Sequence, residues 1–359
     1  MGVQAVARAS SVRSVVRITG NFSSESALHP AAKSALLAAF DQGWADPKKI
    51  SQSAARAAIL RNQAVETIAS KLGIPSHAIE ILGEPALGHY LGIAGLLDGD
   101  TALAYAATDK GKIRAVARSH HGKVLELQVN PDGEIIYPTD FQQPAVLSLQ
   151  LANSETGVIQ RNPQIAFSSI AIDATTSGAQ IPLPDKWDTA LFDATSWAGP
   201  SGLGILAVNS AKYRYPIPHI APIRVPGTYS LPLLIAAAVA LENYSPIDPT
   251  LRNEVIHQFS KVPGVKIVAP DAPAIADKIS LIVDGVAGEQ LVRALSAIDI
   301  DVDTGSACSP ADIQPSHVLA AMGYPTSGHI RITLHQGVTP ADISSLKESF
   351  VRTLQELRG

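Results

Sequence analysis

The sequence predicts a large α/β domain followed by a smaller α+β domain. Before about residue 240, short apolar runs typical of strands alternate with helices and turns. Several of these runs are apolar on both faces, as strands of a covered, mostly parallel sheet are. After about residue 240 the pattern changes to short strands that are closely followed by helices, which indicates a second unit.

The N-terminal part begins with a predicted first strand at 15–18. Apolar spacing near 3.6 predicts helices over 30–42 and 53–72. A turn is predicted at Asn130-Pro-Asp-Gly133. The remaining strand-like runs of this part cover 102–106, 124–129, 146–151, 170–172, 189–192 and 204–208.

The C-terminal part follows an apolar stretch at 231–241, which is too short for a membrane span and contains Pro232, so a buried helix is expected. The last helix, 340–357, is predicted to begin with Thr339 as its N-cap and Pro340 in its first turn. The other expected elements are helices at 248–260, 287–298 and 315–322 and strands at 265–269, 279–284, 301–303 and 329–334. We expect the large domain to cover 15–235 and the small domain 236–359, with residues 1–28 packed on the small domain.

Composition excludes several classes of function. The 359 residues include 28 basic and 32 acidic side chains, and this balance argues against a nucleic-acid binder driven by bulk charge. One cysteine allows neither an internal disulfide nor a cysteine-rich metal site, and the histidines lack metal-ligand spacing. We therefore expect no metal, no membrane segment and, because a lone cysteine fits a reducing compartment, a cytoplasmic protein.

The single cysteine, Cys308, lies in the segment Asp303-Thr-Gly-Ser-Ala-Cys-Ser-Pro310, between a predicted strand and a predicted helix. A thiol in a loop of small residues is accessible, and nearby backbone N–H groups favour the reactive thiolate. A buried, unreactive cysteine is the alternative. These residues by themselves leave both interpretations open.

Three C-terminal segments, TGSACSP at 304–310, QPSHVLAAMG at 314–323 and HIRIT at 329–333, closely resemble the C-terminal part of the cysteine desulfurases. These are pyridoxal-phosphate enzymes of the class V, aminotransferase-like group. The resemblance implies that Cys308 attacks the substrate sulfur and carries it as a persulfide. It also implies that Arg331 holds the substrate carboxylate, to which a guanidinium binds through two hydrogen bonds.

Upstream segments resemble the same family in the same order. LANSETGVIQ at 151–160 is similar to its Asn-Asn-Glu-x-Gly segment, and GPSGLG at 199–204 is similar to the Gly-Pro turn after its cofactor lysine. Asp173 matches the aspartate that pairs with the pyridine nitrogen. Thr228 matches the threonine that reaches the cofactor phosphate of the partner subunit. The resemblance spans about 15–357 and implies a homodimer and a pyridoxal-phosphate-dependent transferase-like large domain with a mostly parallel sheet.

The departures from the family concern the cofactor. Within the segment that begins at Asp193, Thr195 and Ser196 replace the His-Lys pair whose lysine forms the Schiff base, and serine cannot form an imine. Lys110 replaces the histidine that stacks on the ring, on the wrong side for the usual imine. Ser154 and Thr176 replace an asparagine and a glutamine of the cofactor site.

The phosphate-binding loop is also altered. The family's Gly-Ala-Thr corresponds to Glu84-Pro85-Ala86, so a carboxylate replaces glycine, a proline removes an N–H donor and the hydroxyl is lost at Ala86. Glu84 would also repel a phosphate. Cofactor binding is therefore in question, although pyridoxal phosphate is the cofactor that the resemblance implies.

Three functions remain open at this point. The first is a degenerate desulfurase homologue that cannot run pyridoxal-phosphate chemistry alone and either carries sulfur on Cys308 or partners an active paralogue in a heterodimer. The second is an active desulfurase that mobilises sulfur from L-cysteine for iron–sulfur or other sulfur transfer. The third is a non-catalytic interaction protein on the same fold. A sulfur-acceptor protein is an expected partner in the first two cases.

Overall fold

The computed structural model describes residues 20–42, 45–139, 144–163, 165–219, 229–305 and 315–359. Its larger sheet has seven strands in the order β1-β7-β6-β5-β4-β2-β3. Strand β7 pairs antiparallel with β1 and β6, and the other pairs are parallel, so the predicted mostly parallel sheet is confirmed. The strands are β1 (Ile79–Leu82), β2 (Ala102–Ala106), β3 (Val124–Leu127), β4 (Ala145–Gln150), β5 (Ser169–Asp173), β6 (Thr189–Asp193) and β7 (Gly204–Val208).

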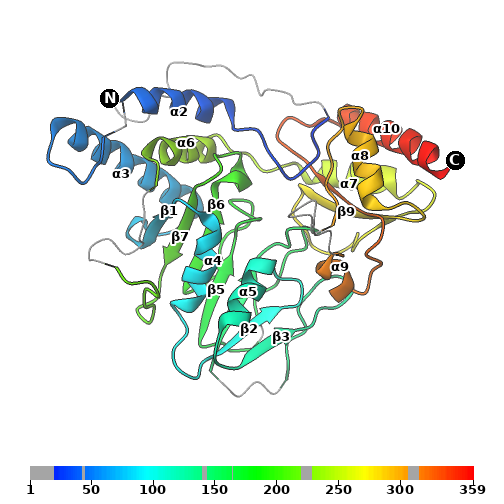
Figure 1. Ribbon diagram of the computed structural model, residues 1–359. Helices are drawn as coiled ribbons and strands as arrows, with labels where there is room; N and C mark the ends of the chain where they lie inside the picture. The colour runs from blue at the N-terminus through cyan, green and yellow to red at the C-terminus, as the bar shows by residue number, and fades with distance from the viewer. Residues whose placement is uncertain (1–19, 43–44, 140–143, 164, 220–228, 306–314) are drawn as a thin grey trace.

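Helices cover both faces of this sheet (Figure 1). Alternate residues of a strand point to opposite faces, so Ile205 and Ala207 of β7 join one apolar cluster and Leu206 joins another. The first cluster is completed by α2 (Pro30–Gln42), α3 (Gln52–Leu72) and α6 (Leu231–Glu242), and the opposite face is covered by α4 (Pro85–Ala94) and α5 (Gly111–Ser119). Helix α6, predicted from the apolar stretch at 231–241, is buried over nearly its whole length.

The smaller unit contains an antiparallel sheet in the order β10-β9-β8, formed by β8 (Val265–Ile267), β9 (Lys278–Val283) and β10 (His329–Thr333). Its core includes Phe259 and Phe350, whose rings meet edge to face at 5.1 Å. The helices of this unit are α7 (Pro249–Phe259), α8 (Gly288–Ser296), α9 (His317–Ala321) and α10 (Pro340–Arg358). Helix α10 begins as predicted, with Thr339 as its N-cap.

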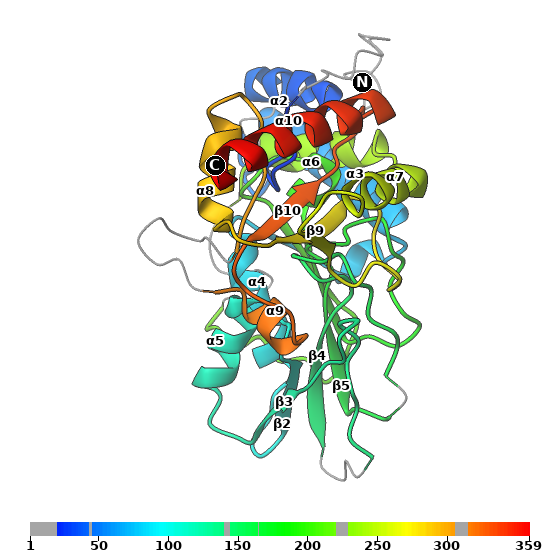
Figure 2. The same ribbon diagram turned by 90° about the vertical axis from the view of Figure 1, so that its right-hand side faces the viewer.

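Two segments connect the two units. Phe22 packs in the core of the smaller unit, and its carbonyl accepts a hydrogen bond of 2.8 Å from the Thr333 N–H. Helix α9 lies between the two sheets beside α5 (Figure 2), where Leu319 belongs to an apolar cluster that includes Val129 and Ile282 from the two units. The predicted boundary between the domains remains a prediction.

The sequence prediction missed some elements. Strand β1 and helix α4 were not anticipated, because β1 has four residues and α4 contains Gly88 and Gly92, which normally weaken a helix. In the structure a Cβ at Gly88 would lie 2.2 Å from a methyl group of the buried Leu191, so glycine lets α4 pack closely on β6 without displacing that side chain.

One predicted strand did not form. Residues 301–303 make only isolated bridges, from Asp301 to Asn21 and from Asp303 to Arg331, so the prediction of a strand was wrong there. The strand predicted at 15–18 lies outside the described residues. No helix in the described parts of the chain combines the length and apolar character needed to cross a membrane.

Candidate functional site

A cleft of about 270 Å³ lies where the large sheet meets the small one. The large sheet contributes side chains that follow the carboxyl ends of β4, β5 and β6, the edge at which open α/β sheets bind ligands. The small sheet contributes basic and hydroxyl side chains from β9 and β10. The cleft thus brings together the predicted residues Ser154, Thr176, Thr195, Ser196 and Arg331, and adds Thr175, Lys278 and Thr333.

Asp173, at the end of β5, is a buried carboxylate with several partners. Its Oδ1 accepts hydrogen bonds from the Thr175 N–H at 2.9 Å and the Thr175 hydroxyl. Its Oδ2 lies 3.5 Å from Lys110 Nζ and 3.4 Å from His89 Nε2. Burial raises the pKa of Asp173, but the Lys110 ammonium and the contacts with His89 and Thr175 outweigh it and hold the pKa well below its ordinary value.

Lys110, the residue just before α5, is the cation of the ion pair with Asp173. It is the N-cap of α5 but makes no capping hydrogen bond, so its side chain extends to Asp173 and also donates to the Thr175 hydroxyl. The ammonium is 20% exposed and the carboxylate 3% exposed. Sequence analysis placed Lys110 near the cofactor ring but did not predict that its charge would neutralise Asp173.

Asp109 precedes Lys110 and is also buried. Its Oδ2 accepts a hydrogen bond of 3.0 Å from the Ala106 N–H. Burial raises the pKa of Asp109 to about 8; the hydrogen bond from Ala106 opposes this effect and the nearby charge of Asp173 adds to it. At neutral pH the Asp109 carboxyl is therefore mainly protonated, and Lys110 remains available to Asp173.

The N-terminus of α4 is occupied by a side chain of the protein itself. Glu84 is the N-cap, and its Oε1 accepts a hydrogen bond of 2.8 Å from the Ala86 N–H. Pro85 has no N–H to offer. The helix end that would attract an external anion thus already carries a carboxylate.

The polar groups of the turn after β6 form hydrogen bonds with one another. Asp193 Oδ1 accepts hydrogen bonds from the Thr195 N–H at 3.0 Å and the Thr195 hydroxyl at 2.8 Å. The Ser196 hydroxyl donates to the Asp193 carbonyl at 2.7 Å. A Cβ at Gly178 would lie 2.4 Å from Ser196 Oγ, so the chain passes closely over this serine.

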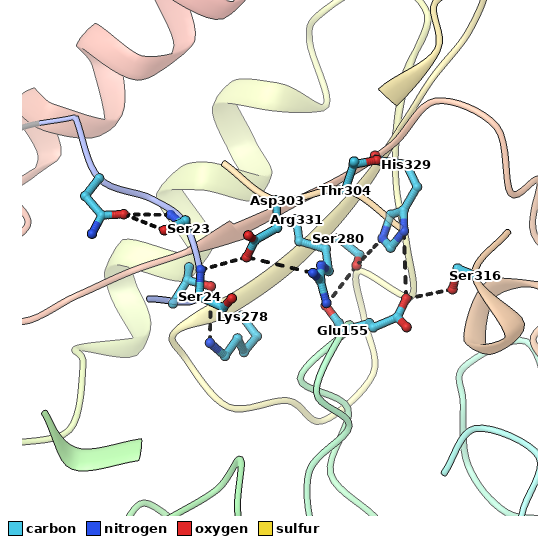
Figure 3. Close-up of polar contacts among 12 residues, drawn as sticks. Ser23, Ser24, Glu155, Lys278, Ser280, Asp303, Thr304, Ser316, His329 and Arg331 are labelled. Carbon is cyan, nitrogen blue, oxygen red and sulfur yellow. Dashed lines mark hydrogen bonds and ion pairs between the residues drawn. The ribbon is translucent and has the colours of Figure 1, made fainter. Parts of the chain in front are cut away.

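Arg331, on β10, forms the opposite wall of the cleft (Figure 3). Its Nη2 lies 3.9 Å from Asp303 Oδ2, an oxygen that also accepts a hydrogen bond of 2.6 Å from the Ser24 N–H. The Nε of Arg331 is buried and has no hydrogen-bond partner among the described residues. The guanidinium is therefore oriented by one carboxylate and retains a donor for a ligand.

A second polar group joins the two units beside Arg331 (Figure 3). Glu155 accepts a hydrogen bond of 2.6 Å from the Ser316 hydroxyl, and the Ser280 hydroxyl donates to the Glu155 carbonyl at 2.9 Å. His329 Nε2 lies 3.0 Å from the Ser280 hydroxyl oxygen. Burial, aided by the charge of Arg331, lowers the pKa of His329 to about 3, so this ring is neutral. These contacts fix β10 against the loop after β4.

Other predicted site residues lie elsewhere or cannot be placed. Cys308 and Thr228 lie outside the described residues. Within the described ranges, no group of three or more His, Cys, Asp or Glu side chains is arranged to hold a metal ion. His89, Asp109 and Lys278 were missed because an isolated His, Asp or Lys beside an apolar run is typical of ordinary packing or solvent exposure.

Comparisons with known proteins agree with this architecture. Residues 224–346 match the class V aminotransferase family. The cysteine desulfurase IscS of Methanosarcina thermophila is 24% identical over 300 residues, covering 72% of this chain and 74% of that protein. The IscS of Dictyoglomus turgidum is 26% identical over 341 residues, covering 82% and 84%.

Solved structures share the fold. A NifS-like protein superposes with a TM-score of 0.83 at 18% identity, covering 94% of this chain and 99% of that one. The cysteine desulfurase CsdA of Escherichia coli superposes with a TM-score of 0.74 at 17% identity, covering 95% and 96%. At these identities the superpositions establish the fold only.

The ion pair between Lys110 and Asp173 predicts a specific loss of stability. Lys110→Met should lower the free energy of unfolding at pH 7 by about 3 kcal/mol, because it leaves a buried carboxylate without its cation. The deficit should shrink as the pH falls below about 4, since the lowered pKa of Asp173 contributes stability only above the pKa of an unfolded aspartate. Urea unfolding at several pH values measures both, with the exposed Lys112→Met as the matched control. Equal losses in the two variants would contradict the assignment.

The buried Asp109 predicts the opposite pH dependence. An unfolded aspartate ionises near pH 3.9, whereas in the folded state Asp109 keeps its proton up to about pH 8. Its contribution to stability therefore falls as the pH rises between these values, by at most about 1.4 kcal/mol per pH unit. Asp109→Asn keeps an acceptor for Ala106 and removes the titration. The variant should gain stability relative to wild type between pH 5 and pH 8 in urea unfolding; a constant difference would refute the raised pKa.

Proposed function

We propose that this chain, a member of the cysteine desulfurase family of class V aminotransferase-like proteins, does not run pyridoxal-phosphate chemistry itself. We propose further that it carries sulfur on Cys308, received from a persulfide donor. The observation that carries the first part is the ion pair between Lys110 and Asp173. Family membership and the position of Cys308 in the sequence support the second part.

Pyridoxal phosphate does not fit the residues present. In the family the aspartate matched by Asp173 pairs with the cofactor's pyridine nitrogen, but here the Lys110 ammonium already lies 3.5 Å from this carboxylate. The phosphate would meet the Glu84 carboxylate at the start of α4. Ser196, at the matched lysine position, offers no amine. The contacts that would hold the pyridine nitrogen and the phosphate are thus replaced by contacts within the chain. The lysine that would form the imine is replaced by Ser196.

The side of the cleft formed by β10, in contrast, is suited to binding a small carboxylate. Arg331 is oriented by Asp303 and has its buried Nε without a protein partner among the described residues. This arrangement supports binding of an amino acid or another small acid in the cleft. The alternative of an active desulfurase would require Lys110 and Glu84 to leave positions in which both are already paired.

Sulfur transfer to Cys308 needs no cofactor. The Cys308 thiolate would attack the outer sulfur of a donor persulfide, the donor's S–S bond would break, and the donor would leave as a thiolate. A small thiol could then take the outer sulfur as its own persulfide and restore the Cys308 thiolate. Electrons and atoms balance in both steps, with only thiols and persulfides taking part.

A second copy of this chain is the partner that we propose. Leu37 and Phe40 of α2 are 61% and 55% exposed, and Ile59 of α3 is 57% exposed. Both helices pack on α6, and large apolar side chains exposed on neighbouring elements favour association. A homodimer is also what the family resemblance implies. An active paralogue as partner and a sulfur-acceptor protein remain expectations.

The cofactor proposal predicts that purified protein mixed with pyridoxal phosphate retains none after gel filtration and gains no visible absorption. Ser196→Lys by itself should restore little, because Glu84 and Lys110 still occupy the anchors. The triple variant Glu84→Gly, Lys110→His and Ser196→Lys should retain the cofactor. Cofactor retained by the wild type and fixed to any lysine by borohydride would overturn the proposal.

The sulfur-carrier proposal predicts a reactive thiol. In native buffer Cys308 should be alkylated at a rate close to that in denaturant, and a persulfide donor should load it with sulfur that a small thiol releases. Mass spectrometry of the intact chain detects the added sulfur, and Cys308→Ser is the control. A thiol that reacts only after unfolding would leave the interaction-protein interpretation in its place.

A further inference from the structure

Lys278 is a basic residue of the cleft to which neither the sequence analysis nor the proposed function gives a role. It is the first residue of β9 and pairs in register with Thr333 of β10, two residues from the pair formed by Ser280 and Arg331. Paired residues of antiparallel strands share a face, and residues two apart share it as well. Lys278 and Arg331 therefore lie on the same face, and both line the cleft (Figure 3).

The amine of Lys278 is held but incompletely neutralised. Its Nζ donates a hydrogen bond of 3.1 Å to the Thr333 hydroxyl and lies 4.0 Å from Asp277 Oδ2. The Asp277 carboxylate has a second partner, since its Oδ1 accepts a hydrogen bond of 3.2 Å from the Gln180 amide. The Lys278 side chain is only 15% exposed, so its ammonium is poorly solvated. Lys278 nevertheless lines the cleft.

Charges around Lys278 come from several elements. Asp277 and Asp303 favour the charged amine, whereas Arg331 and Lys110 oppose it, and His335 lies in the same wall. Burial has the largest effect, and the pKa of Lys278 lies below the ordinary lysine value. Desolvation and a neighbouring cation are the two conditions that make a lysine nucleophilic at neutral pH.

We propose that Lys278 is a nucleophilic amine that forms an imine with a small 2-oxo acid bound in this cleft. The carboxylate of the acid would bind Arg331, whose buried Nε lacks a protein partner among the described residues. The amine nitrogen attacks the carbonyl carbon, the C–O bond breaks, and the oxygen leaves as water with the two amine protons, so that no oxidant or reductant is needed. The hydroxyl of Thr176 on the opposite wall can donate to the departing oxygen.

This inference rests on the proposed function in one respect, namely that pyridoxal phosphate leaves the cleft free. Its substrate class follows from one guanidinium and one poorly solvated amine that share a face of the small sheet and line the same cleft. An acid whose carbonyl is next to its carboxylate can offer the carboxylate to Arg331 and the carbonyl to Lys278, whereas a simple dicarboxylate has no such carbonyl for an amine to attack. The reaction could use the oxo acid directly and does not involve Cys308.

The proposal is tested by reductive trapping of the imine in the full-length chain. Wild-type protein is incubated at pH 7 with glyoxylate or pyruvate and cyanoborohydride, and modified lysines are mapped by peptide mass spectrometry. Lys278 should be modified on the order of tenfold faster than the exposed Lys266 on the neighbouring strand β8. Labelling that simply follows exposure, with Lys266 ahead of Lys278, would overturn the proposal.

Two variants separate the amine from the carboxylate site. Lys278→Arg keeps the positive charge and should remove only the adduct at this position. Arg331→Gln should slow trapping of glyoxylate at Lys278 but leave trapping of the uncharged propanal nearly unchanged. If both aldehydes are slowed equally, the proposed role of Arg331 is wrong.

The same assay separates this inference from the proposed function. Fixation of pyridoxal phosphate on Lys278 would overturn the proposed function and still show a reactive amine. Absence of oxo-acid trapping, together with absence of retained cofactor, would overturn this inference and leave the proposed function standing.

Discussion

A single buried carboxylate, Asp173, sets the electrostatics at the end of β5, next to the cleft. A charge in the interior is tolerated only when it is paired and hydrogen-bonded. Here the pair is completed by Lys110, with Thr175 and His89 as further contacts. Because the cation belongs to the chain, the end of β5 and the start of α5 are linked without a ligand, directly beside Thr175, which lines the cleft.

The small-domain wall has the opposite character. Arg331 and Lys278 are placed on one face by the register of β9 and β10, and the carboxylates near them are distant or shared. Excess positive charge therefore points into the cleft from this side, while the opposite wall presents mainly hydroxyl groups. Such a surface favours small acids, which is the basis of the imine proposed between Lys278 and a 2-oxo acid.

Much of the fold could be predicted from the sequence, because strands that are apolar on both faces and helices with regular spacing carry strong local signals. Helix α4 could not, since its glycines reflect close packing on β6 and not its own helix preference. At the site, the replacements at Ser196 and Glu84 were visible from the family resemblance. The partner of Lys110 was not, because it depends on the distance between two loops that are far apart in the chain.

The proposed loss of cofactor binding has a consequence for the same electrostatics. An aspartate that once faced a pyridine nitrogen would become an unpaired buried charge when the cofactor no longer bound, at a cost of several kcal/mol. A lysine at position 110 removes that cost and, once present, also competes with any returning cofactor. Under the proposed function, Asp173 therefore stabilises the fold through its pair with Lys110 and takes no part in catalysis. Reversal would have to begin at Lys110, because restoring a lysine at Ser196 leaves the ring's anchoring carboxylate already paired.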